Sequence, residues 1–515
     1  MLVRTYSCAL IGVIAIPIRI EVNVDSGVGF FLVGLPDSAI KESQQRIDLS
    51  LKSYGYRIPG RKIVINMAPA DIRKEGSAFD LPLAIGIMMA SEQLRGADRI
   101  EDYYLMGELS LDGSLEPVRG ALPIAIEARR QGKRGIILPE QNAREAAIVS
   151  DIEVLGVKNI KEVIDFFNGD SLIAPTVVNT REEFQKSLND YEYDFADVKG
   201  QANIKRALEI AASGGHNAIL IGAPGSGKTM LAKRLPSILP PLTLNEALET
   251  TKIHSVAGQL SRYATLISVR PFRSPHHTIS DVALVGGGSN PQPGEISLAH
   301  NGVLFLDELP EFKRSVLEVM RQPLEDRTVT IARSKYSVNF PASFMFIAAM
   351  NPCPCGNYNH PKIECTCPPG AVQRYLGKVS GPLMDRIDIH LEVVPLTHDE
   401  LTSDHPCEKS STIRDRVVKA RKIQETRFEA YSQIFCNAQM NTKLVRQYCA
   451  IDNGGEAILK NAMEKLGLSA RAYDRILKVA RTVADLEGSP CINLEHLSEA
   501  INFRSLDKVS WGKNW

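Results

Sequence analysis

The chain has 515 residues, which exceeds one ordinary hydrophobic core and predicts three folded units. Its 60 lysine and arginine residues balance 60 aspartate and glutamate residues, which excludes a uniformly basic surface and leaves any nucleic-acid contact to local cations. Nine cysteines, an odd number with four of them clustered, favour a reducing cytoplasm over a secreted disulfide framework.

Residues 1–168 alternate β-rich runs with helical patterns and predict an α/β domain of their own. The apolar run 8–20 is too short to span a bilayer, and it continues into an alternating strand pattern at 21–27. We therefore expect neither a signal peptide nor membrane association. Residues 169–194 lose periodicity and gain polar side chains, which predicts a linker.

The segments 73–90 and 105–128 resemble the Lon protease domain, an α/β fold like that of ribosomal protein S5. Lon-type hydrolysis needs a serine that is activated by a lysine. Ser77 lies near the position of the catalytic serine of the family, but the residues around it differ from the family's pattern. The chain has no lysine between Lys74 and Lys133, and Ile124 occupies the position of the family's lysine base. We therefore expect a proteolytically inactive domain, with a structural or DNA-engaging role.

The chain reads GAPGSGKT at residues 222–229, between the apolar run 218–221 and a helical pattern, which predicts a phosphate loop. Its glycines let backbone N–H groups close around phosphate oxygens at a helix N-terminus. Lys228 is predicted to contact the β- and γ-phosphates, and Thr229 to bind Mg²⁺. The expected nucleotide-binding residues are Gly222, Ala223, Pro224, Gly225, Ser226, Gly227, Lys228, Thr229 and Met230.

A second segment, GVLFLDEL at 302–309, complements the phosphate loop. Its apolar residues predict a buried strand that delivers Asp307 to Mg²⁺ and Glu308 to the attacking water. The two segments together predict ATP hydrolysis. They lie within residues 195–395, whose alternating strands and helices predict a doubly wound parallel sheet with its ligand at the carboxyl ends of the strands.

The order of these motifs resembles that of AAA+ ATPases, and the resemblance assigns four further residues. Gln201 lies in the segment that lines the adenine pocket of AAA+ proteins. Asn351 ends a predicted strand, as does the sensor-1 residue that orients the water. Arg386 precedes an edge strand as an arginine finger does, which implies that it stabilises transition-state charge in a neighbouring subunit. Arg471 lies near a helix start, as the sensor-2 arginine does.

Two basic segments are candidates for DNA contact. The first, residues 269–277, presents Arg270, Arg273, His276 and His277 in a predicted loop, as expected of a helix-2 insert. The second, residues 328–340, consists of two alternating runs that predict a hairpin before the sensor-1 strand, with Arg333 and Lys335 at its tip. A ring without net charge must concentrate cations in its pore to hold phosphates. The alternative is an ordinary solvated turn.

Four cysteines follow Asn351 within a loop rich in proline, at positions Cys353, Cys355, Cys365 and Cys367. Four thiolates suit a tetrahedral Zn²⁺ site, with His360 as a spare candidate ligand. The two residues of each pair are separated by one residue rather than the usual two to four. A packed set of reduced thiols is the alternative.

The run 272–312 resembles the Mg-chelatase-like AAA+ group, in the branch that contains YifB and ComM. Matches at 33–43 and 348–356 extend the resemblance over essentially the whole chain. It implies a homo-hexameric ATPase whose helical residues 396–515 form a lid of the Mg-chelatase C-terminal type.

For ComM-type members, the resemblance implies an ATP-driven DNA helicase. Such a helicase promotes branch migration during natural transformation, when incoming single-stranded DNA is integrated. Three alternatives remain: a motor that remodels protein partners without DNA, a metal-insertion motor, and an ATP-dependent peptidase. The Lon-like unit and the cysteine cluster count against the metal-insertion motor, and the missing lysine counts against the peptidase.

Overall fold

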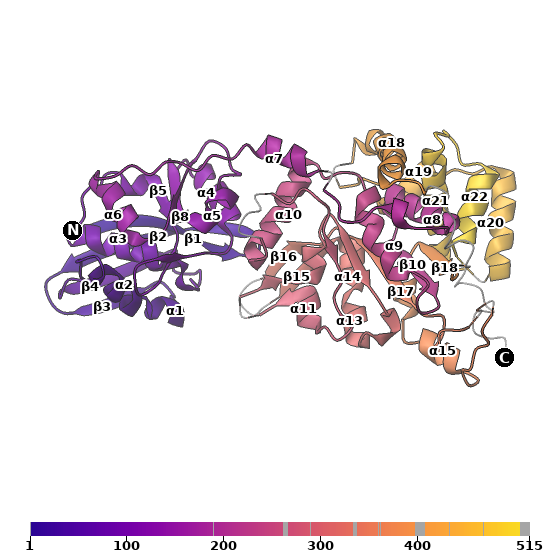
Figure 1. The fold of residues 1–515 in the computed structure, drawn as a ribbon, viewed down its shortest axis with the longest axis horizontal. Helices are drawn as coiled ribbons and strands as arrows, with labels where there is room; N and C mark the ends of the chain where they lie inside the picture. Colours follow the sequence, from indigo (N-terminus) through magenta and orange to yellow (C-terminus); the bar gives the residue numbers. More distant parts are fainter. Residues whose placement is uncertain are drawn as a thin grey trace.

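The structure, a computed structural model, describes residues 2–504 except 189, 261–265, 289, 333–336, 359, 361, 397–406, 432 and 467. Figure 1 shows an elongated molecule in which an N-terminal α/β unit, a central α/β unit and a set of C-terminal helices follow one another. The predicted multidomain α/β fold class is therefore confirmed. Of the helices in the described part of the chain, none is long and apolar enough to cross a membrane.

The N-terminal unit is built on a seven-stranded sheet of order β3-β4-β2-β1-β5-β8-β9. The apolar run that begins at residue 8 forms part of a long antiparallel hairpin, with Ile11 paired to Ile14 across the turn. The sheet strands are β1 (Leu2–Ile11), β2 (Ile14–Asp25), β3 (Gly29–Val33), β4 (Lys62–Ala68), β5 (Tyr103–Leu105), β8 (Gly135–Pro139) and β9 (Glu153–Val157). The helices are α1 (Ser38–Lys41), α2 (Ser43–Lys52), α3 (Asp80–Ala90), α4 (Ala121–Arg130), α5 (Glu140–Ala146) and α6 (Ile160–Asn168), and β6 (Glu108–Leu109) pairs with β7 (Leu115–Glu116).

The central unit contains a five-stranded, all-parallel sheet of order β11-β14-β17-β10-β18, as the sequence predicts. The strands are β10 (Ala218–Gly222), β11 (Phe272–Arg273), β14 (Val303–Leu306), β17 (Met345–Met350) and β18 (Ile389–Val393). The helices are α8 (Ala202–Gly214), α9 (Lys228–Arg234), α10 (Leu244–Ala257), α11 (Asp281–Val285), α12 (Glu295–Leu298), α13 (Arg314–Val319), α14 (Arg321–Asp326), α15 (Ala371–Leu376) and α16 (Gly381–Met384). Since β14, β17 and β10 are neighbours, their carboxyl ends form one continuous edge.

The structure corrects the prediction of a helix-2 insert at residues 269–277. Phe272 and Arg273 form the edge strand β11, and the Phe272 ring stacks on Phe305 of β14 with centroids 5.8 Å apart. The insertion into the helical segment after β11 is instead the two-stranded ribbon of β12 (Gly286–Gly287) and β13 (Gln292–Pro293), which lies between α11 and α12. The prolines that suggest a loop therefore flank a short strand that packing stabilises.

The C-terminal helices pack on the central unit and share one hydrophobic core with it. They are α18 (Ser410–Phe428), α19 (Thr442–Tyr448), α20 (Asn453–Leu466), α21 (Ala470–Leu486) and α22 (Leu494–Asn502). Polar contacts reinforce this packing, because the buried carboxylate of Asp388 contacts His216 Nδ1 at 3.2 Å and also pairs with Arg475 of α21. Although burial opposes ionisation, the Arg475 guanidinium and the hydrogen bond with His216 hold the pKa of Asp388 well below its usual range.

The segment 169–194, predicted as a linker, contains one helix, α7 (Thr180–Ser187). Its first part runs beside the N-terminal sheet, where the Thr176 N–H donates to the Val154 carbonyl at 2.8 Å. The two α/β units also touch directly. The Gly120 N–H donates to the Ser255 carbonyl of α10 at 3.1 Å, and the Ser255 hydroxyl donates to the buried carboxylate of Glu145.

A second contact joins the β1–β2 turn to the hairpin of β15 (Thr328–Ala332) and β16 (Ser337–Pro341), toward which it points in Figure 1. Ile11 and Val13 pack on the core beneath this hairpin. Gly12 lies between them with φ +60°, and a Cβ at this position would stand 2.5 Å from Val338 Cγ1. The turn therefore fits the hairpin only with glycine at its tip.

We expect Gly12→Ala to weaken this contact. The left-handed backbone alone costs an alanine about 1–2 kcal/mol, and the clash with Val338 adds about 1–3 kcal/mol. Gly132→Ala is the matched control, because Gly132 has φ +68° and open space around its Cβ position. Thermal unfolding of both variants measures the difference, and equal first transition temperatures would contradict the contact.

Candidate functional site

The phosphate loop occupies the turn from β10 into α9. Gly222 ends the buried strand, and Lys228, Thr229 and Met230 open the helix. Gly225 and Gly227 have φ values of +76° and +91°, the left-handed region in which a side chain is strained. In a phosphate loop, such turns let backbone N–H groups face an anion at the helix N-terminus.

Lys228 is 8% exposed and folds back over the loop that carries it. Its Nζ donates to the carbonyls of Gly222 at 2.7 Å and Ala223 at 2.9 Å, and to Asn351 Oδ1 at 3.3 Å. Burial lowers the pKa of Lys228, while Asp307 and Glu308 act in the opposite direction. The ammonium group is therefore held at the strand ends, where phosphate oxygens can replace its carbonyl partners.

Asp307 and Glu308 follow β14 at the same edge. Thr229 Oγ1 donates to Asp307 Oδ2 at 2.6 Å, and the Glu308 N–H donates to Asp307 Oδ1 at 2.9 Å. Glu308 has φ +53°, and its side chain is 56% exposed. Its carboxylate Oε2 lies 3.5 Å from Nδ1 of His277. Asp307 is thus tied to the phosphate loop, while Glu308 projects toward solvent.

These residues fit a nucleoside triphosphate and Mg²⁺. A hydroxyl and a carboxylate at Thr229 and Asp307 are the hard oxygen ligands that Mg²⁺ prefers. Two buried polar atoms of the site, Ser226 Oγ and Gln201 Oε1, have no hydrogen-bond partner among the described residues. Gln201 Nε2 also donates to the Ser226 carbonyl at 3.1 Å, so the predicted adenine segment contacts the phosphate loop. The loop therefore retains polar groups that a ligand can satisfy.

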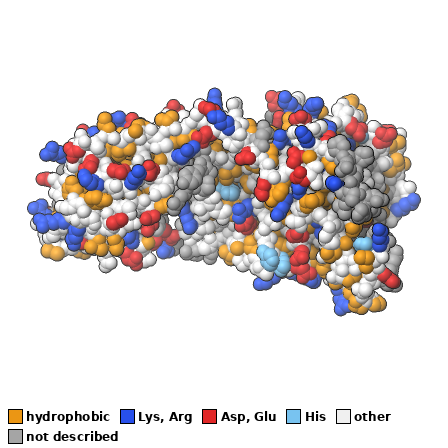
Figure 2. Space-filling view, viewed as in Figure 1, with side chains coloured by type: hydrophobic (Ala, Val, Ile, Leu, Met, Phe, Trp, Pro, Cys, Tyr) orange, Lys and Arg blue, Asp and Glu red, His pale blue; other side chains and the backbone are white. Residues whose placement is uncertain are grey.

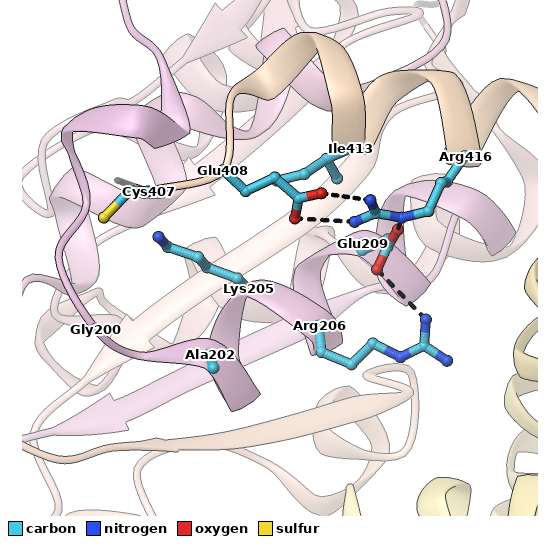
Figure 3. Close-up of a pocket in the computed structure, with 9 residues that line it drawn as sticks. All are labelled: Gly200, Ala202, Lys205, Arg206, Glu209, Cys407, Glu408, Ile413 and Arg416. Atoms are coloured by element: carbon cyan, nitrogen blue, oxygen red, sulfur yellow. Dashed lines mark hydrogen bonds and ion pairs between the residues drawn. The ribbon is translucent and has the colours of Figure 1, made fainter. Parts of the chain in front are cut away.

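A pocket of about 410 Å³ lies next to Gln201, between α8 and the start of α18 (Figure 3). Its charged side chains pair with one another: Arg416 contacts both Glu408 and Glu209, and Glu209 also contacts Arg206. These residues line it: Gly200, Ala202, Lys205, Arg206, Glu209, Cys407, Glu408, Ile413 and Arg416. The pocket adjoins the segment predicted to line the adenine site.

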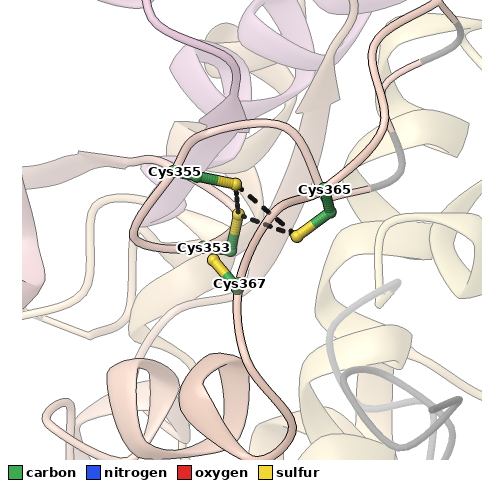
Figure 4. A group of neighbouring side chains, drawn as sticks. All are labelled: Cys353, Cys355, Cys365 and Cys367. Atoms are coloured by element: carbon green, nitrogen blue, oxygen red, sulfur yellow. Dashed lines mark hydrogen bonds between the residues drawn. The ribbon is translucent and has the colours of Figure 1, made fainter.

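The four clustered cysteines come together as predicted. Their sulfur atoms all lie within 4.8 Å of one another, and the side chains point toward a common centre (Figure 4). The Sγ distances from Cys353 are 3.3 Å to Cys355 and 3.7 Å to Cys365. Four thiolates around Zn²⁺ would place their sulfurs about 3.8 Å apart, so the set fits this ion.

The pKa values of the thiols diverge within the cluster, because burial raises the pKa of Cys353 to about 12. Burial opposes ionisation at Cys355, yet a backbone N–H of Asn357 and the Cys353 thiol lower its pKa to about 6. His360 does not belong to the group that the described residues form, because its Nδ1 accepts backbone N–H groups of Lys362 and Ile363 at 3.1 and 3.0 Å. The structure thus corrects its assignment as a spare ligand.

Arg386 and Arg471 lie away from the phosphate loop of their own chain. Arg386 pairs with Glu325, and its carbonyl accepts from Asn217 Nδ2 at 3.0 Å, just before β10 begins. Arg471 stands 3.6 Å from Asp385. Both therefore lie near the amino end of β10, and about 13 Å of strand separates this end from Gly222. A sensor-2 contact of Arg471 within the same chain does not fit this placement.

The residues predicted to contact DNA are partly engaged within the chain. Arg270 donates to the Asn301 carbonyl at 2.7 Å, and Arg273 forms a two-pronged pair with Glu295 at 2.6 Å. His276 contacts Thr278 at 2.9 Å. Arg333 and Lys335 lie outside the described residues, in the sequence between β15 and β16. Positive and negative side chains are interspersed over the face in Figure 2.

A groove beside Glu308 and Asn351 was not predicted from the sequence. It has a volume of about 520 Å³, and α15 contributes one of its walls. The following residues line it: Glu308, Glu311, Asn351, Pro354, Ala371, Arg374, Tyr375 and Lys378. Residues 371, 374, 375 and 378 have the spacing of one helical face. This spacing is present in the sequence, but in so short a helix it is too brief to predict a shared surface.

In the N-terminal unit, Ser77 has a carboxylate as its partner. Its hydroxyl donates to Glu108, whereas the Lys74 Nζ is buried and donates to the carbonyls of Gly34 and Pro69. Ile124 is buried on α4. The described residues thus contain no lysine next to Ser77, and the absence of peptidase activity stays a prediction.

Comparisons with known proteins match nearly the whole chain. The family model described as magnesium chelatase, subunit ChlI, matches residues 194–401. A model described as subunit ChlI of Mg-chelatase matches 20–142, and a model of the ChlI C-terminal region matches 407–504.

Three relatives illustrate the similarity. The chain is 43% identical to the competence protein ComM of Haemophilus influenzae over 507 residues, 98% of this chain and 97% of ComM. It is 42% identical to the protein YifB of Escherichia coli over 507 residues, 97% of this chain and 96% of YifB. Lon protease 2 of Bacillus subtilis is 28% identical over 130 residues, 25% of this chain and 23% of the protease.

The site geometry separates nucleotide binding from hydrolysis. Glu308→Gln is expected to retain nucleotide binding and to lower kcat about 100-fold or more, because the side chain can no longer accept a proton from water. Lys228→Ala is expected to lose binding, because the loop then lacks its phosphate cation. Binding of a fluorescent ATP analogue and phosphate release measure the two effects. Full hydrolysis by the Glu308 variant would contradict its assignment.

Proposed function

The chain belongs to the Mg-chelatase family of AAA+ proteins, as a ComM/YifB-type member, and from this premise we propose that it is an ATP-dependent DNA translocase. Its proposed work is branch migration during the integration of incoming single-stranded DNA in natural transformation. The observation that carries the proposal is the similarity along 98% of the chain to a competence protein, together with an assembled nucleotide site.

The family suggests ATP and Mg²⁺, and the residues of the site suit both. Thr229 and Asp307 would hold Mg²⁺, which neutralises phosphate charge when bound. Glu308 would accept a proton from the attacking water, and Asn351 would orient that water beside Lys228. These groups come from three adjacent strand ends, so a triphosphate at the phosphate loop would meet all of them.

The positions of Arg386 and Arg471 suit assembly into a ring. Because Arg386 and Arg471 lie at the amino edge of the sheet, they would act on the nucleotide of a neighbouring subunit. Arg386 is 13% exposed, pairs with the exposed Glu325 and donates to the Pro382 carbonyl, while the exposed Arg471 pairs with Asp385. Phosphate oxygens of a neighbour would have to displace these partners. We propose a homo-hexamer, as the family resemblance implies.

The hairpin of β15 and β16 would be the element that contacts DNA. Its strands bury Val329, Ile331, Val338 and Phe340 against the central unit, while Thr330 and Asn339 are exposed. The sequence places Arg333 and Lys335 at the turn between these strands. A hairpin that is anchored by its buried face and basic at its tip suits contact with phosphates in a pore.

The proposal predicts that the protein and ATP release strands from a labelled three- or four-stranded DNA junction, and that Lys228→Ala abolishes release. Arg333→Ala/Lys335→Ala is expected to abolish release and to make DNA binding less dependent on salt, because fewer counterions are displaced. The matched control is Lys161→Ala/Lys186→Ala, which removes two exposed cations elsewhere. ATP hydrolysis without DNA binding or release would favour a motor that acts on protein or metal partners.

We also propose that the cysteine cluster holds a structural Zn²⁺. Its support is the convergence of four thiols with sulfur separations close to those of a tetrahedral site. The loop buries little apolar surface besides Tyr358 and Val372, so an ion would supply much of its stability.

The purified protein is expected to contain close to one zinc per chain by elemental analysis. Cys353→Ser or Cys365→Ser should remove most of it, because a tetrahedral site then loses a thiolate ligand. Cys491→Ser is the control, since this exposed thiol lies outside the cluster. Wild-type protein that is purified without chelators and lacks zinc would leave the cluster as four reduced thiols and would refute the proposal.

A further inference from the structure

The groove lined by α15 begins at the hydrolytic end of the nucleotide site. Glu308 and Asn351, the two residues expected to face the attacking water, form one end of it. Arg374 and Tyr375 of α15 extend it, together with Lys378 just after the helix. A side chain of α15 that enters this groove therefore approaches the position of the γ-phosphate.

The two basic side chains of the groove differ in their partners. Lys378 pairs with Glu311, with Nζ 3.2 Å from Oε1. Arg374 is exposed, and among the described residues its side chain makes one hydrogen bond, from Nε to the carbonyl of Gly370, the residue just before α15, at 3.4 Å. Within the described part of the chain it has no carboxylate partner. It is thus the cation of this groove that remains available to an anion, and its planar fork suits phosphate oxygens.

The helix that carries Arg374 is held by contacts with Asn351 and with the cysteine loop. Tyr375 is buried beside the backbone of Asn351, and burial raises its pKa to about 12. Val372 packs against Cys353 and Tyr358 of the cysteine loop. The loop in turn touches the phosphate loop, because a Cβ on Gly356 would stand 2.5 Å from Pro224 Cδ. Arg374 is therefore mounted on a support that contacts both Asn351 and the phosphate loop.

We propose that Arg374 is a catalytic residue for ATP hydrolysis in its own subunit, where its guanidinium contacts γ-phosphate oxygens. The inference rests on the proposed ATPase function. Water attacks the γ-phosphorus and gives a proton to Glu308, while the bond from the γ-phosphorus to the bridging oxygen breaks and ADP leaves. Arg374 donates hydrogen bonds to the oxygens that carry the shifting charge and transfers no proton.

The roles of the arginines then differ by subunit. Arg386 lies at the amino edge of the sheet and would serve a neighbour, whereas the groove of Arg374 is lined by the same chain that supplies Glu308 and Asn351. Each site would thus combine one arginine of its own with arginines from the adjacent subunit. The cysteine loop would then support the helix that carries Arg374.

The test compares Arg374→Ala, Arg374→Lys and Gln373→Ala in the full-length protein. Arg374→Ala is expected to lower kcat about 100-fold with little change in the KM for ATP, in zinc content or in Tm. Arg374→Lys should recover part of this loss, because it restores the charge without the fork. Gln373→Ala is the control, because Gln373 is an exposed neighbour outside the groove lining and should behave as wild type.

Several outcomes would overturn the inference. An unchanged kcat in Arg374→Ala, with an active wild type, would refute it and leave the ATPase function intact. A loss of kcat that parallels losses of zinc and Tm would assign Arg374 a structural role instead. A wild-type protein without ATPase activity would refute the proposed function itself.

Mixing experiments decide which subunit Arg374 serves. Arg374→Ala mixed with Lys228→Ala should remain inactive, because every site then lacks a residue of its own. Arg386→Ala mixed with Lys228→Ala should recover activity, since a Lys228→Ala subunit can donate its intact Arg386 to a neighbour. Recovery in the first mixture would overturn the assignment to the same subunit.

Discussion

The nucleotide site depends on one property of parallel sheets: neighbouring strands end at the same edge. β14, β17 and β10 are adjacent, so the residues that follow them meet although they are far apart in sequence. Asp307 reaches Thr229, and Asn351 reaches Lys228, without any long loop between them. The buried strands fix these positions, since each side chain leaves a strand end whose backbone cannot move independently of the sheet.

The elements that surround this edge form a series of contacts in space. Asn351 leads directly into the cysteine loop, this loop contacts Pro224 and Val372, and Val372 belongs to α15. On the other side of the central unit, the β1–β2 turn of the Lon-like unit packs on the β15–β16 hairpin. The N-terminal unit therefore contacts the element proposed to hold DNA, which gives it a structural role that does not require peptidase chemistry.

Much of the site was predictable, because its signals are short and local. A buried strand followed by glycines and Lys228 specifies a phosphate loop within residues 218–228, and the strand before Asp307 does the same for the metal ligand. The convergence of the four cysteines also follows from a short, proline-rich loop. Residues 269–277 form a loop as predicted except at Phe272 and Arg273, where pairing with β14 and stacking on Phe305 make a short edge strand that the sequence analysis did not predict.

The sequence alone is sufficient to infer the chemistry of the phosphate loop, the parallel α/β class of the central unit and the family resemblance, since these depend on neighbouring residues or on matched motifs. The tertiary structure decides which edge of the sheet each remote arginine occupies. It places Arg386 and Arg471 away from their own nucleotide site and puts Arg374 in the groove that Glu308 also lines. These relations arise from strand order and helix packing, and the spacing of residues along the chain does not encode them in any local pattern.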